Sequence, residues 1–460
     1  MNKVNTVVRE RNTKYLFIGC LVLISLCYMF FTIIFRYEDS ICFTVIGVEF
    51  WECIFKGDGI SSYYSYVISD PWNVLPGAIP GSYLTWLPWI LWNLPLFLSG
   101  VSVTTCATST LCLLWSKMFL LVNLGFLYIY IYKAISHITN GNVLYSQLGV
   151  LLTAGSLELL DSVAYTGQDE IVYLNFLMIS FYMFIKGKKL AAIGWGIAAV
   201  TVCPLMIIPF CLMTGIYFEN FFKAVGATAL SAIPTLLFEF VYRNDTVYAS
   251  LKGLNTVSTF QMMMNTCTIH TAIGSISIGA VILVLLGVYC YFIHDDVDKN
   301  RKAIIVTAIT FVIMTFLMDT TFYRSCIYIP FLVLFLFIDG FCLDYKVIAF
   351  WILGICKFSY FITNSYNFAT RYLADFVTSR LAIQGDNILN PTSQMYDSLL
   401  YITKTAAAAA VIVIFVLYFF KARVSLKTLI KKEEQLFIVP VAVPIAFTVF
   451  FTLRILAMSH

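Results

Sequence analysis

Charged residues are scarce in this chain of 460 residues: 12% are Asp, Glu, Lys or Arg, and 60% are hydrophobic. A soluble protein of this length would need a larger share of polar residues to cover its surface. The net charge of +4 is spread over short segments between apolar runs. That pattern lacks the concentrated basic face of a nucleic-acid-binding protein. Composition therefore excludes both classes.

Several signatures of known chemistry are also missing. No CxxC pair occurs among the 13 cysteines, so a thiolate metal site has no support. The four histidines show no metal-ligand spacing, and no phosphate-binding loop, dinucleotide fingerprint or Ser/His/Asp arrangement is present. Most cysteines lie in apolar runs, where cysteine behaves as a small hydrophobe. Cys42 and Cys53 share one predicted loop, in which a disulfide between them is one alternative.

Long apolar runs are what the chain has in abundance, and its mean hydropathy is +0.86. A membrane-spanning helix needs roughly 20 apolar residues. Ten runs reach or approach that length, near 15–35, 110–133, 168–185, 222–242, 271–293, 303–318, 326–341, 346–362, 405–420 and 437–457. Three more, 82–98, 147–163 and 189–218, are shorter or interrupted. The runs predict an all-α, polytopic transmembrane protein of about 13 helices in a single domain, 1–460.

The orientation follows from lysine and arginine, which collect on the cytoplasmic side of a membrane. Their clusters at 3–14, 186–189, 297–302 and 421–432 place the N-terminus in the cytoplasm, and the first run is expected to be a retained helix rather than a signal peptide. The predicted outer loops are 36–80, 164–170, 243–268, 319–325 and 364–398. Segment 189–218 is then expected to be a hairpin of two short helices, broken around Cys203 and Pro204.

The number of segments between the first two outer loops does not fit this orientation. Two outer loops must be separated by an even number of crossings, yet three segments lie between 36–80 and 164–170. Pro88 and Pro95 interrupt 82–98, so this segment is expected to form two short crossings or a re-entrant pair. In loop 36–80, apolar residues recur at helical spacing beside Glu49 and Glu52, which predicts a helix lying in the membrane interface.

Three groups of ionisable residues converge on the predicted outer side. They are Glu38-Asp39 after the first helix, Gln168-Asp169-Glu170 with Asp161 two turns earlier, and Asp319 with Arg324. A partly desolvated carboxylate can act as a general base, and an arginine can bind a phosphate through two hydrogen bonds. Each group also has a purely structural interpretation: a solvated loop acid, a carboxylate favoured at a helix N-terminus, or an arginine that extends to the interface.

Taken in order, these features resemble a known family. An outer acid follows the first helix, a proline-rich segment leads into the second, and Gly167-Gln168 precedes Glu170. A lysine-rich turn and a short GIAA-type helix before a proline-containing break come next. This arrangement is similar to the C-type (GT-C) glycosyltransferases that use polyprenyl-phosphate sugars, in particular bacterial relatives of the glycosylphosphatidylinositol mannosyltransferases. The similarity is clearest over 164–218, looser over 36–98, and only architectural beyond 220.

The resemblance implies a catalytic module in 1–220 and a variable helical module in 221–460. It implies inverting transfer of a hexose such as mannose, with Asp39 as the catalytic base. The substrate-binding residues it implies are Glu38, Gln168, Asp169, Glu170, Arg324 and Arg371. No cofactor is required, although a divalent metal could bind through Asp39, Asp169 and Glu170. Many relatives carry a lysine six residues after the glycine of the short helix, where this chain has Val202.

The implied partners are a lipid-linked sugar donor, a glycan or lipid acceptor and the membrane, with no nucleic acid. A bacterial plasma membrane is favoured over the endoplasmic reticulum. Three other functions stay open. A transporter or lipid flippase would show two related halves and charges near mid-membrane, and no internal repeat is evident. A polysaccharide polymerase or ligase would use arginines such as Arg371 and Arg380 in loop 364–398. A non-catalytic assembly subunit would fit the missing lysine.

Overall fold

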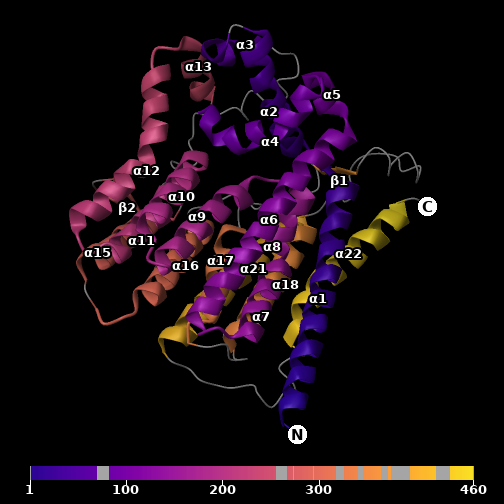
Figure 1. The fold of residues 1–460 in the computed structure, drawn as a ribbon, viewed down its shortest axis with the longest axis vertical. Coiled ribbons are helices and arrows are strands. Elements are labelled where there is room, and N and C mark those ends of the chain that lie inside the picture. The colour runs from indigo at the N-terminus through magenta and orange to yellow at the C-terminus, as the bar shows by residue number, and fades with distance from the viewer. Residues whose placement is uncertain are drawn as a thin grey trace. The chain divides into compact units, whose positions relative to one another are not determined.

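The computed structural model describes residues 2–57, 59–69, 82–254, 267–272, 274–293, 295–317, 326–339, 345–363, 371–373, 394–420 and 436–458. Within them helices predominate, and the strands form two short antiparallel ribbons (Figure 1). The predicted all-α class is therefore confirmed.

Three helical segments have the length and composition of a membrane span: Thr13–Ile34, Thr110–Ile138 and Phe221–Tyr242. A bent pair, Val143–Ala154 with Leu157–Thr166, provides a fourth if it counts as one span. These helices mark the chain as a membrane protein. Most of the other predicted spans correspond to shorter apolar helices in the described residues, so the number of about 13 crossings stays a prediction.

The chain divides into two compact units, and each is built from separate stretches of sequence. Unit 1 comprises Met1–Tyr37, Tyr128–Thr166 and Ile329–His460, and unit 2 comprises Glu38–Leu127 and Gly167–Tyr328. The predicted boundary near residue 220 stays a prediction.

Unit 1 consists mainly of helices. Its elements are α1 (Asn2–Ile34), β1 (Phe35–Tyr37), the end of α6 (Thr110–Ile138), α7 (Val143–Ala154), α8 (Leu157–Leu159), the π-helix η3 (Leu160–Thr166), α17 (Ile329–Leu336), α18 (Tyr345–Thr363), β4 (Arg371–Leu373), α21 (Gln394–Phe419) and α22 (Val439–Met458). Here α1 packs beside α22, α18 beside α21, and β1 pairs with β4. Aromatic rings fill the space between α1, η3 and α22: Phe35 lies 4.6 Å from Tyr165, and Phe31 lies 5.1 Å from Phe447, between ring centroids.

The membrane segment 143–166 of unit 1 is broken rather than straight. α7 ends at Gly155, Ser156 caps α8 by accepting a hydrogen bond from the Leu159 amide, and the two halves meet at 49°. Gly155 is needed at the break, because a Cβ there would lie 2.1 Å from the carbonyl oxygen of Pro440 in α22. The break therefore brings two backbones into direct contact.

Unit 2 begins with the predicted interfacial segment. Its elements are α2 (Glu38–Lys56), η1 (Ile60–Ser62), α3 (Tyr63–Ser69), η2 (Tyr83–Trp86), α4 (Leu87–Leu98), α5 (Val103–Thr108), the start of α6, α9 (Glu170–Ile185), α10 (Lys189–Val202), η4 (Pro204–Met206), α11 (Ile207–Tyr217), α12 (Phe221–Tyr242), α13 (Thr246–Leu254), β2 (Thr268–Thr271), β3 (Gly274–Ser277), α15 (Ile278–Phe292) and α16 (Lys299–Phe316). Figure 1 shows α2, α4 and α5 gathered at one end of this unit.

Two predictions for unit 2 are confirmed. α2 is a helix over the residues whose apolar spacing predicted one. The break near Cys203 and Pro204 is present as well: Cys203 is extended, as a residue before proline prefers, and it separates α10 from η4 and α11.

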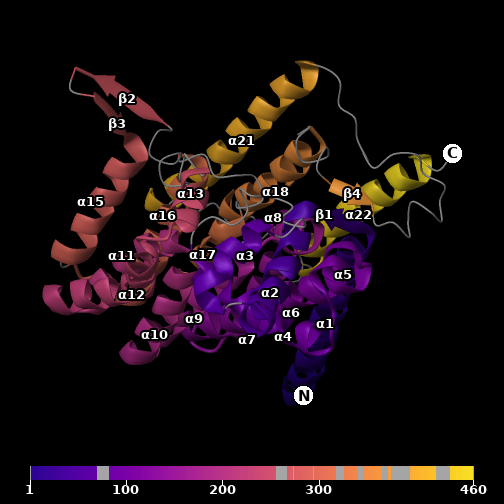
Figure 2. The same cartoon turned by 90° about the horizontal axis from the view of Figure 1, so that it is seen from above.

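Two predictions for unit 2 are wrong, and one alternative is excluded. Segment 82–98 forms the short 3₁₀ helix η2 followed by a single α-helix, α4, of only 12 residues or about 18 Å, with Pro88 in its first turn. The run 271–293 begins as the β2–β3 ribbon, which extends from the N-terminal end of α15 (Figure 2). Cys42 and Cys53 lie eleven residues apart on the single helix α2, a separation of about 16 Å that no disulfide can bridge.

The length of α4 bears on the parity of the predicted crossings. α4 packs against α2 and is too short to cross the membrane. Two segments then remain between the first two predicted outer loops, α6 and the bent pair of α7 with α8 and η3. If the bent pair is one span, the number is even, as the predicted orientation requires, and that orientation stays a prediction.

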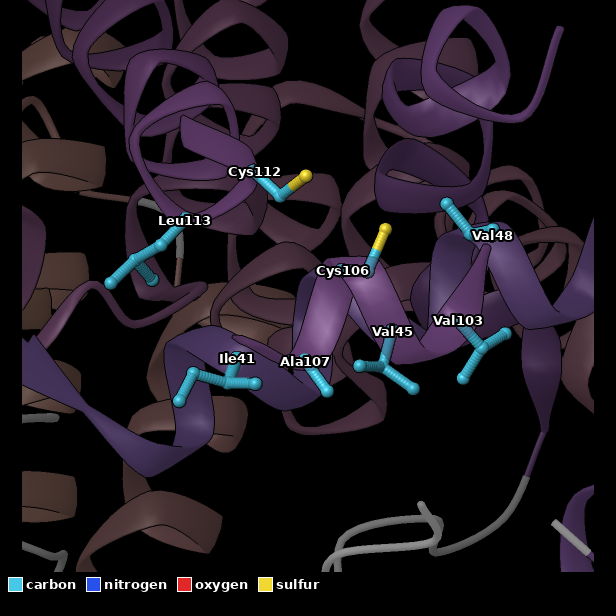
Figure 3. Close-up of a cluster of buried hydrophobic side chains, with 8 residues drawn as sticks. All are labelled: Ile41, Val45, Val48, Val103, Cys106, Ala107, Cys112 and Leu113. Carbon is cyan, nitrogen blue, oxygen red and sulfur yellow. The ribbon is translucent and has the colours of Figure 1, made fainter. Parts of the chain in front are cut away.

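Indole rings hold α4 on the first turns of α6. Trp92 and Trp115 are stacked with ring centroids 5.0 Å apart, and each indole N–H donates to the other residue's carbonyl oxygen at 3.0 and 3.3 Å. Trp51 of α2 donates to the Ile90 carbonyl oxygen of α4 at 2.7 Å. An apolar cluster of α2, α5 and α6 side chains, drawn in Figure 3, lies at the same end of the unit.

Candidate functional site

The first turn of α2 meets the segment that leads into α9. The hydroxyl of Ser40 donates to the carbonyl oxygen of Gly167 at 3.3 Å, a contact between residues 127 positions apart. Gly167 has φ +67, a left-handed conformation that favours glycine. A Cβ on Gly167 would lie 2.4 Å from Ser40 Oγ. Two of the predicted groups, Glu38-Asp39 and 168–170, therefore belong to adjoining segments of unit 2.

A buried lysine lies at the same junction. Lys117 of α6 has no exposed surface, and its Cε is 3.3 Å from the position that a Gly167 Cβ would take. An ammonium group is costly to bury unless charged or polar groups surround it. Ser40 and the Gly167 backbone lie at the same junction as Lys117, and the carboxylates of 169–170 follow directly in sequence.

The acidic residues of this junction open helix α9. Asp169 is half-buried at the N-cap position, and Glu170 is a buried first residue. Gln168 is buried as well. A carboxylate is favoured at a helix N-terminus, where unpaired N–H groups carry partial positive charge. The dipole therefore accounts for the position of Glu170, and its burial beside a segment that contacts Lys117 makes it a candidate site residue.

Buried polar groups continue from this junction along α6. The hydroxyls of Thr44 and Ser116 lie 2.6 Å apart, which joins α2 to α6. The Asn175 amide of α9 donates to the Asn123 side-chain oxygen at 3.3 Å. We call this set the polar seam of unit 2: Ser40, Thr44, Ser116, Lys117, Asn123, Gly167, Gln168, Asp169, Glu170 and Asn175. Polar residues in membrane helices are costly, and they commonly mark functional sites.

The C-terminal half of α2 carries two further acids with structural roles. Glu52 accepts hydrogen bonds from Lys56 at 3.0 Å and from the Tyr66 hydroxyl at 3.3 Å. Glu49 is buried beside Tyr63 of α3. Burial raises the pKa of Tyr63 well above its usual range, and the Glu49 carboxylate adds to the increase. These contacts tie α3 to α2.

The remaining predicted residues are distributed differently. Glu38 and Asp39 are the first two residues of α2, and only their backbone is among the described parts. Arg371 lies in β4 of unit 1, opposite Tyr37 in the β1–β4 ribbon. Arg324 and Asp319 lie outside the described residues. The roles predicted for all of them stay predictions.

Sequence reasoning missed Lys117. It lies within the run 110–133, which reads as uniformly apolar when hydropathy is averaged over a window. A single ionisable residue inside such a run is itself a signal of function. Among the residues that the structure describes, no group of three His, Cys, Asp or Glu side chains is placed to hold a metal ion. Metal binding through Asp39, Asp169 and Glu170 stays a prediction.

Unit 1 contains a separate candidate site at the break between α7 and α8. A small cavity of about 30 Å³ is lined there by Ser156, Glu158, Trp351, Gly354 and Pro440, among others. Glu158 is buried, and Asp161 is buried in the π-helix one turn later. Irregular helices of this type occur frequently at functional sites.

Comparisons with protein-family models, curated proteins and solved structures find no match to this chain.

Proposed function

We propose that this protein is a multi-pass membrane glycosyltransferase that moves a hexose from a polyprenyl-phosphate donor to a hydroxyl acceptor on the outer face of the membrane. The observation that carries the proposal is the junction at Gly167. There a buried lysine, a helix N-terminus that begins with two acids, and a second helix N-terminus that begins with Glu170 adjoin one another. Acidic residues and a lysine in one polar seam suit this reaction. A carboxylate can take the proton of the acceptor hydroxyl, and a cation can offset the charge of the departing phosphate.

In this mechanism the Asp39 carboxylate takes the proton of the acceptor hydroxyl. The acceptor oxygen attacks the anomeric carbon, the bond from that carbon to the phosphate oxygen breaks, and its electron pair leaves with the lipid phosphate. Inversion follows from this single displacement, without a covalent intermediate. Lys117, with Arg324 as predicted, offsets the phosphate charge. Lys117 would supply the cation that the expected lysine position, occupied by Val202, lacks.

The test incubates purified protein with a panel of polyprenyl-phosphate sugars and acceptors and measures released lipid phosphate. We expect turnover with at least one donor, and a loss of about 100-fold or more in Asp39→Asn. Asp296→Asn is the matched control, because Asp296 is an exposed acid of the segment between α15 and α16. Full transfer activity in folded Asp39→Asn protein would remove the base assignment.

A second candidate function, transport or lipid flipping, is favoured by one observation in unit 1. Broken membrane helices with buried acids at the break are typical of transporters. The α7–α8 break with Glu158 and Asp161 has this form. Substrate-dependent transport in vesicles that is lost in Asp161→Asn, combined with no turnover of any sugar donor, would reverse the order of the two candidates.

A further inference from the structure

Two cysteines face each other across the corner between α5 and α6 of unit 2. Ser109 ends α5 in an extended conformation, with φ −83 and ψ 122, and α6 begins at the next residue. On one continuous helix, residues six apart point in different directions. The extended residue turns the chain, so the Cys106 and Cys112 side chains, both free thiols in the structure, lie in the same buried apolar cluster. Figure 3 shows both sulfur atoms directed into the space between their helices.

The surroundings of the pair are apolar and closed. Cys106 and Cys112 are buried, and the cluster around them is completed by Ile41, Val45 and Val48 of α2, with Val103, Ala107 and Leu113. Burial raises the pKa of the Cys106 thiol, and the neighbouring Cys112 adds to the increase. A thiol is the reactive species only as thiolate. In the folded protein the pair is therefore slow to react, and a bond between the sulfurs must form before α2 covers them.

The pair lies on the predicted outer side. α5 and α6 hold it against α2, and α2 belongs to loop 36–80, which the lysine distribution places outside. Disulfides form and persist on that side of a membrane and are rare in the cytosol. The two cysteines are close in sequence as well as in space, so they meet early in folding.

We propose that Cys106 and Cys112 form an intramolecular disulfide as the chain folds on the outer side of the membrane. The oxidant is the disulfide of a thiol–disulfide oxidoreductase. One cysteine thiolate attacks a sulfur of that disulfide, which gives a mixed disulfide and releases one donor thiolate. The second cysteine thiolate then attacks the first cysteine's sulfur and releases the second donor thiolate. The two cysteine sulfurs are oxidised, the donor is reduced, and it takes up the two protons.

This bond would fix the α5–α6 corner on which the N-terminal half of α2 packs. Ile41 of the cluster directly follows Ser40, the residue that contacts Gly167. The inference does not rest on glycosyl transfer; it rests on the geometry of the corner and on the outer location of α2.

The test denatures freshly isolated membranes in detergent with N-ethylmaleimide, which blocks every free thiol. The protein is then reduced, and newly exposed thiols are labelled with a maleimide of large mass. We expect two labels on the wild-type protein, none on Cys106→Ser or Cys112→Ser, and two on the control Cys20→Ser, which changes another buried cysteine. Peptide mass spectrometry of the wild-type protein, which needs no variant to fold, should find residues 106 and 112 linked.

A wild-type protein without reduction-dependent labels would overturn the proposal. So would labels that persist in the Cys106→Ser/Cys112→Ser double variant, because the bond would then lie elsewhere.

Discussion

Replacement of Gly167 by alanine tests the junction between α2 and α9 most directly. The left-handed conformation at φ +67 costs an alanine about 1 kcal/mol. The added Cβ would also lie 2.4 Å from Ser40 Oγ, below any normal contact, and 3.3 Å from Lys117 Cε. Movement of Ser40 would weaken its hydrogen bond to the Gly167 carbonyl, a further loss of about 1 kcal/mol. We therefore expect Gly167→Ala to lower the free energy of unfolding by about 2–4 kcal/mol.

Gly187 provides the matched control. Its φ of +70 is nearly the same, and no atom lies within 4 Å of the position that a Cβ would take. Gly187→Ala should therefore lose only the conformational part, about 1 kcal/mol. The measurement is denaturant unfolding of each purified variant in mild detergent. Equal losses in the two variants would refute the contact at Gly167.

A double variant separates the two contributions at Gly167. Ser40→Ala removes the Oγ atom that the new Cβ would meet. The Ser40→Ala/Gly167→Ala protein should therefore be less destabilised than the sum of the single variants. Strict additivity would show that the overlap with Ser40 has no energetic effect.

The remaining predictions concern α10, the α15–α16 segment and the polar seam. Gly196→Ala places a Cβ 2.0 Å from the Phe210 ring and should cost about 1–3 kcal/mol in denaturant unfolding. The Tyr289 hydroxyl donates to Asp295 and lowers the pKa of that carboxyl. The pKa of Asp295 is therefore lower in the folded than in the unfolded protein. The stability that results is present above pH about 4 and is lost as pH falls further. Lys117→Met should reduce sugar transfer by about 100-fold.

Each of these predictions has a control in the same element or segment. Gly194→Ala in α10 meets nothing within 4 Å and should be close to neutral. Asp295→Asn should remove the loss of stability at low pH that comes from this carboxyl. If stability falls with pH in this variant as it does in the wild-type protein, the attribution to Asp295 is contradicted. Lys133→Met changes an exposed lysine of α6 and should leave transfer unaffected. If Lys133→Met lost as much transfer activity as Lys117→Met, the burial of Lys117 would not explain its importance for transfer.

Local features were predictable from sequence because they follow from local chemistry. The helical spacing of apolar residues beside Glu49 and Glu52 predicted α2, and Pro204 predicted the break after α10. The prolines of 82–98 led to a wrong prediction, because Pro88 lies in the first turn of α4, where a proline is compatible with a helix. A single α-helix, α4, therefore formed where two short crossings or a re-entrant pair were expected.

The site was less predictable than the helices. The predicted groups 38–39 and 168–170 do adjoin, but their contact through Ser40 and Gly167 joins residues 127 positions apart, and no local pattern specifies such a contact. Lys117 escaped notice because one charge barely alters the average hydropathy of a long run. Its importance depends on burial, which only the fold reveals.

The stacked pair of Trp92 and Trp115 gives this protein an internal optical reporter. Five of its eight tryptophans, Trp51, Trp86, Trp89, Trp92 and Trp115, lie in α2, η2, α4 and the first turns of α6. Indoles stacked at 5.0 Å couple their electronic transitions, so their near-ultraviolet circular dichroism is sensitive to the distance between them. Tryptophan emission and this signal will therefore report chiefly on the α2–α4–α6 corner, and ligand titrations can follow that corner without any added label.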